Sequence, residues 1–179
     1  MDRKWWVELL KKAEIQYKFA LALNTTYNSR IEEDLPNLSY LAYFAYGKYG
    51  TGGKELRLNK KEEKYAVTLL EHSAIYLIAV QIDSALEDLF RSRFNHPNKD
   101  IRTISCIIRL IRNAFAHNPF APRWLLDRRF KNKTYTIGDL TFRTNGLNNK
   151  LVKKMDYGGP VALLLLSKFV RTEIENLSS

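Results

Sequence analysis

The sequence predicts a single, mainly helical domain over 1–179, in which four or five helices form a bundle and a small β-hairpin is inserted before the last helix. Three observations favour this fold class. A chain of 179 residues fits one domain of ordinary size. Apolar residues recur at helical spacing through most of the chain, and polar–apolar alternation is confined to one short region. The composition, 45% hydrophobic and 27% charged, is typical of a folded soluble protein.

Two helices are expected in the first part of the chain. Over 2–24, apolar residues return every three or four positions with lysine and glutamate between them, which is typical of an amphipathic helix. We expect this helix to end near Asn24. A second helix is expected over about 31–47, where aromatic residues are frequent. Residues 47–54 are rich in glycine, so we expect them to form a connector.

Two further helices are expected in the middle of the chain. A long third helix is predicted over about 61–94, because its apolar residues form a continuous stripe and Pro97 follows it. A fourth helix should begin at a cap formed by Asn98 or Asp100. It should end near His117, because the proline two residues further on disfavours helical geometry at the residue before it.

The last third of the chain changes character before it returns to a helix. Residues 133–137 and 140–144 alternate polar and apolar side chains around a Gly-Asp pair, which predicts a β-hairpin. This hairpin belongs to an insertion of about 124–145. The closing helix should begin at Pro160, a favoured first-turn residue, and continue through Ile174.

Charge and cysteine content limit the function classes. The formal net charge of +10 attracts polyanions, of which nucleic acid is the commonest, and a generic solvated surface is the alternative. Cys106 is the only cysteine, so neither an intrachain disulfide nor a cysteine metal cluster is expected, and a reducing, cytoplasmic setting is favoured. The contiguous apolar runs are shorter than the roughly 20 residues of a membrane span, and no signal peptide is expected. Three scattered histidines form no recognisable metal site, so we expect no metal and no cofactor.

A polar wedge interrupts the otherwise apolar fourth helix. Asn113 and His117 are four residues apart and share one face, Arg109 lies four residues before Asn113, and Arg112 flanks that row. A histidine titrates near neutrality and can give or accept a proton, while an arginine can hold a phosphate with two parallel hydrogen bonds. Together they supply the groups needed to cleave an RNA phosphodiester through attack of its own 2′-hydroxyl, without a metal.

Other charged residues are candidates to support this motif. Asp83 and Glu87 on the third helix are candidates to orient Arg112 across the bundle. Four basic residues after the motif are candidates to follow an RNA backbone: Arg123, Arg128, Arg129 and Lys131. The plainer interpretation makes His117 a helix cap, Arg112 a member of a structural ion pair, and the basic residues a solvated surface.

The pattern Arg112-Asn113-x-x-x-His117 at the end of a helix resembles the HEPN superfamily (higher eukaryotes and prokaryotes nucleotide-binding domains). The resemblance covers roughly residues 1–120 and 160–177. It implies that Arg112 and His117 form the catalytic pair of a metal-independent endoribonuclease, with Asn113 as a supporting polar residue of the same site. It also implies a homodimer. The hairpin is not part of the minimal HEPN bundle.

The leading hypothesis is therefore a HEPN-type endoribonuclease with RNA as its substrate and 2′,3′-cyclic phosphate products, in a toxin–antitoxin or phage-defence setting. One alternative is a non-catalytic HEPN-like module that binds RNA, a nucleotide or a protein partner. Another is a toxin held silent by a cognate antitoxin protein.

Overall fold

The computed structural model describes residues 2–29, 44–46, 49–51 and 58–177. Its α-helices are α1 (Arg3–Ser29), α2 (Lys60–Leu89), α3 (Lys99–His117) and α4 (Ala162–Asn176). Three short 3-10 helices connect them: η2 (Arg93–Asn95), η3 (Arg128–Phe130) and η4 (Lys154–Tyr157). Two antiparallel hairpins pair β1 (Phe44–Tyr46) with β2 (Tyr49–Thr51) and β3 (Thr134–Ile137) with β4 (Leu140–Arg143). A mainly helical fold with a hairpin before the last helix is thereby confirmed.

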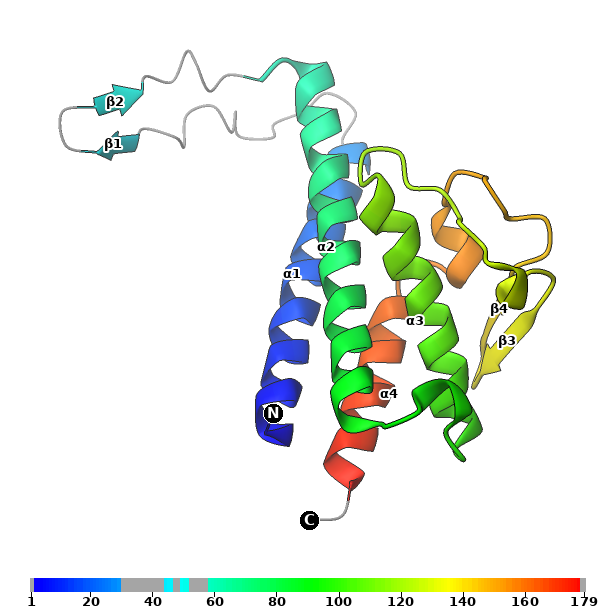
Figure 1. Cartoon of the computed structure of the whole chain (residues 1–179). Coiled ribbons are helices and arrows are strands. Elements are labelled where there is room, and N and C mark those ends of the chain that lie inside the picture. The colour runs from blue at the N-terminus through cyan, green and yellow to red at the C-terminus, as the bar shows by residue number, and fades with distance from the viewer. Residues whose placement is uncertain (1, 30–43, 47–48, 52–57, 178–179) are drawn as a thin grey trace.

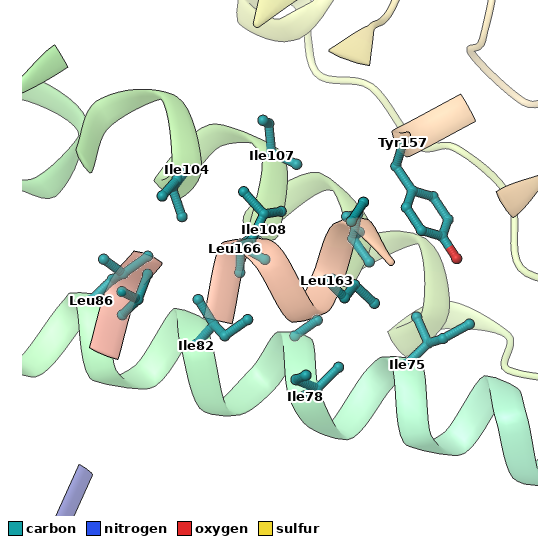
Figure 2. Close-up of a cluster of buried hydrophobic side chains, with 14 of the residues drawn as sticks. Ile75, Ile78, Ile82, Leu86, Ile104, Ile107, Ile108, Tyr157, Leu163 and Leu166 are labelled. Carbon is teal, nitrogen blue, oxygen red and sulfur yellow. The ribbon is translucent and has the colours of Figure 1, made fainter. Parts of the chain in front are cut away.

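Helix α2 is the centre of the bundle. It contacts α1 on one side and α3 on the other, and α4 packs behind them (Figure 1). The side chains that fill the space between α2, α3 and α4 are branched aliphatic residues, drawn in Figure 2. Ile78 and Ile82 of α2 and Ile104 and Ile108 of α3 are fully buried. Each such side chain stabilises the fold by about 1.5–3 kcal/mol relative to an exposed position.

The apolar character of α2 follows from this central place. By length and composition alone, Lys60–Leu89 is apolar enough to cross a membrane, with a mean hydropathy of 1.4 over 18 residues, although its contiguous apolar runs are short. In the structure, 39% of that window is buried. Because α2 contacts α1, α3 and α4, apolar side chains are needed on several of its faces.

Asparagine caps set the starts of α2 and α3. The Asn59 side chain accepts hydrogen bonds from the backbone of Lys61 and Glu62, and the Glu62 carboxylate accepts one from the backbone of Asn59, which makes a capping box. Asn98 caps α3 by accepting from the Asp100 backbone amide, so Asn98 is the cap of the two candidates. The predicted bounds of α3 are confirmed at both ends.

Two helix ends differ from the prediction because of tertiary contacts. Helix α1 continues to Ser29 beyond Asn24, whose side chain is buried and donates a hydrogen bond to Glu71. Helix α2 ends at Leu89, whereas the prediction carried it to 94. Ser92 adopts a left-handed φ of 56°, and this turn brings Arg93 back against Asp83 of α2.

The second predicted helix is wrong where the structure describes it. Residues 44–46 form β1, and 49–51, within the expected connector, form β2. Aromatic residues suit a paired strand as well as a helix face, which explains the error. The rest of the predicted helix and of the connector lies outside the described residues.

The predicted hairpin is confirmed and is built into the core. Ile137 pairs with Leu140 across a two-residue turn, and β3 lies against α3. The buried ring of Phe142 packs on Trp124, at 5.2 Å between ring centroids. Gly158, with a φ of +98°, lies so close to Leu140 that an added Cβ would be 2.0 Å from its Cδ1. Glycine is therefore required there, because it tolerates both the backbone angle and the close approach.

Helix α4 begins two residues later than predicted. Pro160 lies in the turn before Ala162, and its carbonyl accepts a hydrogen bond of 2.7 Å from the hydroxyl of Tyr17 in α1. This bond ties the start of α4 to the first helix.

Candidate functional site at the end of helix α3

The motif arginine is held in place by a buried carboxylate. Arg112 Nη1 lies 2.5 Å from Asp83 Oδ2, and its Nη2 donates to Asn113 Oδ1 at 3.3 Å. The Asp83 side chain is 1% exposed and that of Arg112 is 29% exposed. One edge of the guanidinium is therefore fixed inside the bundle while part of the group remains accessible to solvent.

A second arginine shares the same carboxylate. Arg93 Nη1 lies 2.9 Å from Asp83 Oδ1 and also donates to the Asp83 backbone carbonyl. Arg93 is 5% exposed, so both partners of this pair are buried. Two arginines contact Asp83, so these three side chains carry one excess positive charge, which the exposed Glu87 carboxylate beside Arg93 partly offsets.

The two acidic residues expected beside Arg112 are placed differently. Asp83 contacts Arg112, whereas Glu87 contacts Arg93, with 3.7 Å between Arg93 Nη2 and Glu87 Oε2. Glu87 is 70% exposed, and solvent screens such a pair so strongly that it contributes little. Arg93 was missed because it lies beyond the end of α2 and reaches Asp83 only through the turn at Ser92.

His117 occupies the last turn of α3 with its side chain exposed. Within the described part of the chain its ring has no hydrogen bond or ion pair, so it does not cap the helix. Arg112 lies five positions before it, which corresponds to about 140° around the axis and about 7.5 Å along it. Arg112 and His117 therefore project from different sides of α3, while Asn113 lies about 40° from His117.

The turn after His117 is anchored to its surroundings. Asn118 Oδ1 accepts hydrogen bonds from the backbone amides of Phe120 and Ala121, at 3.0 and 3.2 Å. The Pro119 carbonyl lies 2.8 Å from Nδ1 of His72 on α2. Because a carbonyl only accepts, Nδ1 of His72 carries the proton in this bond. The end of α3 is thus attached to α2.

Arg109 lies beside the motif without a bond to it. Its angular position is about 60° from Arg112 and about 40° from Asn113 around the axis of α3. The side chain is half-buried, and its Nε has no hydrogen-bond partner among the described residues. A buried donor without a partner is costly, and because this nitrogen is inaccessible to solvent, a ligand does not reach it in this arrangement.

One of the four predicted RNA-binding residues reaches the arginine cluster. The guanidinium of Arg129, 59% exposed, lies over the ring of Phe94 at 5.8 Å and over Phe130 at 4.6 Å. Arg93 lies over the same Phe94 ring at 5.0 Å. The shared ring therefore connects η3 with the cluster that holds Arg112, through cation–π contacts.

The other three predicted RNA-binding residues are exposed, but no described contact joins them to that cluster. Arg128 and Lys131 flank Arg129 along η3 and the residue after it. Arg123 donates to the backbone carbonyl of Asn149 at 2.7 Å, in a segment paired with Leu151.

A second buried carboxylate, Glu71, lies twelve positions before Asp83 on α2. Glu71, 1% exposed, contacts Lys154 at 2.6 Å and accepts a hydrogen bond from Asn24. Burial raises the pKa of Tyr17 and of Tyr157 nearby well above the ordinary tyrosine value, and the negative charge of Glu71 raises both further. This cluster joins α1, α2 and η4, and its ion pair is neutral.

Other reactive groups are not prepared for catalysis. Burial raises the pKa of the Cys106 thiol, which disfavours the nucleophilic thiolate. In the ranges that the structure describes, no three or more histidine, cysteine, aspartate or glutamate side chains are grouped to hold a metal ion.

No protein-family model matches the chain, and neither does any curated protein or any solved structure. Its function is therefore argued from the residues of the site.

Proposed function

We propose that the chain is a metal-independent endoribonuclease of the HEPN type, with Arg112 and His117 as its catalytic pair. The observation that carries this proposal is the arginine cluster. Asp83 orients Arg112, Arg93 shares that carboxylate, and the remaining positive charge lies at a partly exposed position. Such a fixed cation is suited to bind a phosphate and to stabilise charge that develops on it.

The proposed reaction needs one proton removed and one proton delivered. The 2′-hydroxyl of the RNA attacks the adjacent phosphorus, the bond to the 5′-oxygen of the next nucleotide breaks, and a 2′,3′-cyclic phosphate forms. His117 accepts the proton of the 2′-hydroxyl, water delivers a proton to the departing 5′-oxygen, and Arg112 stabilises the negative charge on the non-bridging oxygens. Asn113 supports Arg112 through its hydrogen bond.

A homodimer is part of the proposal because Arg112 and His117 project from different sides of α3. If the ends of two α3 helices face each other, Arg112 of one subunit and His117 of the partner subunit can act on the same phosphate. Mixing the Arg112→Ala and His117→Ala proteins tests this directly. In a random mixture, half of the dimers contain one subunit of each variant. Each of these mixed dimers has one site that keeps both Arg112 and His117 and one site that has lost both. About a quarter of the parental activity should therefore return. A site formed within one chain would give no recovery.

The RNA backbone is proposed to pass from the arginine cluster towards η3. Arg129 continues the positive charge through Phe94, and the exposed Arg128 and Lys131 flank it. In this proposal the protein acts on RNA in the cytoplasm, in a toxin–antitoxin or phage-defence setting. A cognate antitoxin protein is then a further partner, and growth arrest on expression alone is its test.

Cleavage of a labelled oligoribonucleotide in the presence of EDTA tests the proposed function. We expect the Arg112→Ala and His117→Ala proteins each to cut at least about 100-fold more slowly than the parent, the range typical for loss of a proton-transfer group. Lys168→Ala, which removes an exposed charge from α4, is the matched control and should cut at the parental rate. Parental rates for both motif variants would contradict the proposal.

A non-catalytic binding module is the second candidate, and the Arg112–Asp83 ion pair favours it. That pair joins α3 to α2 and supports the bundle whether or not RNA is cleaved. In this case the parent binds RNA, a nucleotide or a protein partner and leaves RNA intact in the same assay.

A further inference from the structure

Two large aromatic rings lie exposed beside the end of α3. Tyr65, in the second turn of α2, is 53% exposed, and Phe120, three residues after His117, is 60% exposed. Their ring centroids are 6.4 Å apart and their planes differ by 12°. Two nearly parallel rings that remain open to solvent present aromatic faces on which a planar ligand can stack.

Phe120 is held by its backbone. Its amide donates to Asn118 Oδ1, and the carbonyl of the preceding Pro119 is bound by His72. The turn therefore fixes the backbone of Phe120 and directs its exposed ring towards Tyr65. An exposed ring on an anchored backbone can stack on a ligand at a smaller cost in conformational freedom than a ring on a free loop.

Charge beside the rings suits a phosphodiester strand. Lys61 lies one helical turn before Tyr65 on the same face of α2, and Lys64 precedes it directly; both are exposed. The nearby Glu62 carboxylate is engaged with the backbone of Asn59 in the capping box. Stacking rings with adjacent cations are the combination by which proteins bind unpaired nucleic-acid strands.

We propose that Tyr65 and Phe120 form a platform on which an unpaired base of the RNA stacks, several nucleotides along the strand from the phosphate at Arg112, because Tyr65 and Asp83 are 18 positions apart on α2, about 27 Å along its axis. The inference rests on the proposed function for the identity of the strand. Stacking tolerates every base because each has a π-face, so the platform selects single-stranded RNA rather than a sequence. A base within a duplex is already stacked and paired, which excludes it from the platform.

Fluorescence anisotropy with a labelled single-stranded oligoribonucleotide tests the platform. All proteins carry His117→Ala so that the strand stays intact. Tyr65→Leu and Phe120→Leu should each weaken binding at least about fivefold, the lower end of the loss for one stacked base, and the double variant should bind more weakly still. Phe19→Leu is the matched control, since Phe19 is 64% exposed on α1, which lies on the other side of α2 from α3 (Figure 1). It should bind as tightly as the protein with His117→Ala alone.

A fluorescent base reports the stacking itself. 2-aminopurine is placed at successive positions of the strand. The protein that retains both rings should quench the fluorescence at one or two of these positions. The quenching should disappear in the double variant. A duplex of the same sequence should compete poorly for the protein that retains both rings.

Each outcome separates the platform from the cleavage reaction. The platform is overturned if the double variant, with parental thermal unfolding, binds the strand as tightly as the protein that retains both rings. It is overturned as well if Phe19→Leu loses as much affinity or if no RNA is bound. Loss of binding in the double variant with no cleavage by the parent supports the platform and removes the ribonuclease. Cleavage by the parent with unchanged binding by the double variant supports the ribonuclease and overturns the platform.

Discussion

Helix α2 carries two buried carboxylates whose surroundings differ. Asp83 and Glu71 are each 1% exposed, and each is paired with basic side chains. Asp83 is shared by Arg93, which is buried, and Arg112, which is 29% exposed. Glu71 is paired with Lys154 alone, whose side chain is 42% exposed.

The difference separates a binding cluster from a structural one. A buried charge must be paired, and both carboxylates meet that requirement. The Glu71–Lys154 pair is neutral and joins three elements of the bundle. The Asp83 cluster presents the charged guanidinium of Arg112 at a partly exposed position, so it attracts an anion. We therefore propose that the Asp83 cluster binds the phosphate of the proposed substrate.

The largest expected effect on stability comes from removing the Asp83 charge. Asp83→Asn leaves the buried Arg93 without its counter-charge, and we expect a loss of about 3–5 kcal/mol in the free energy of unfolding. Glu71→Gln should cost less, about 1–2 kcal/mol, because Lys154 is partly exposed and stays hydrated. Urea unfolding of both variants measures this. If both variants lost the same free energy of unfolding, or Glu71→Gln lost more, the proposed difference between the Asp83 and Glu71 clusters would be contradicted.

High pH should weaken the Glu71 cluster in particular. Burial raises the pKa of Tyr17 and Tyr157 in the folded protein, so the stability they contribute is complete below the unfolded value of about 10 and falls as the pH rises above it. We expect the unfolding free energy of the parent to decrease between about pH 9 and about pH 11. Tyr17→Phe and Tyr157→Phe should each flatten that decrease.

Urea unfolding at several pH values measures the alkaline effect. Tyr76→Phe is the control, because Tyr76 is exposed on α2 and should leave the slope against pH unchanged. The account of the buried tyrosines fails if all three variants show the parental slope.

The smallest effect is expected at His117. Because its ring is exposed and unbonded among the described residues, His117→Ala should change the free energy of unfolding by less than about 0.5 kcal/mol. A helix cap at this position would instead cost about 1–2 kcal/mol. Thermal unfolding of parent and variant distinguishes the two, and a loss in the larger range would favour a structural histidine.

The sequence predicted correctly those elements whose ends are set by neighbouring residues, such as a capping side chain, a proline or a turn. The asparagine cap and the following proline set both ends of α3, and the alternating pattern around a Gly-Asp pair set the β3–β4 hairpin. Distant contacts set the ends that were misplaced. Asn24 continues α1 because its amide reaches Glu71, and α2 stops early because the turn at Ser92 brings Arg93 to Asp83.

The site was predictable only in part for the same reason. Asp83 was a candidate partner of Arg112 because an acid in an apolar stretch needs a counter-charge. Arg93 was not, since nothing in its neighbours shows that the chain turns back there. The pairing of Tyr65 with Phe120 joins residues far apart in sequence, so the sequence pattern did not indicate it.

The central claim is that Arg112 and His117 cleave RNA without a metal. The most direct measurement incubates the purified parent and the Arg112→Ala/His117→Ala double variant with total RNA and with a defined oligoribonucleotide in EDTA, and identifies the new 3′ ends by mass spectrometry. The account predicts cleavage by the parent alone, with 2′,3′-cyclic phosphate ends. Cleavage by both proteins, or intact RNA with a well-folded parent, would contradict it.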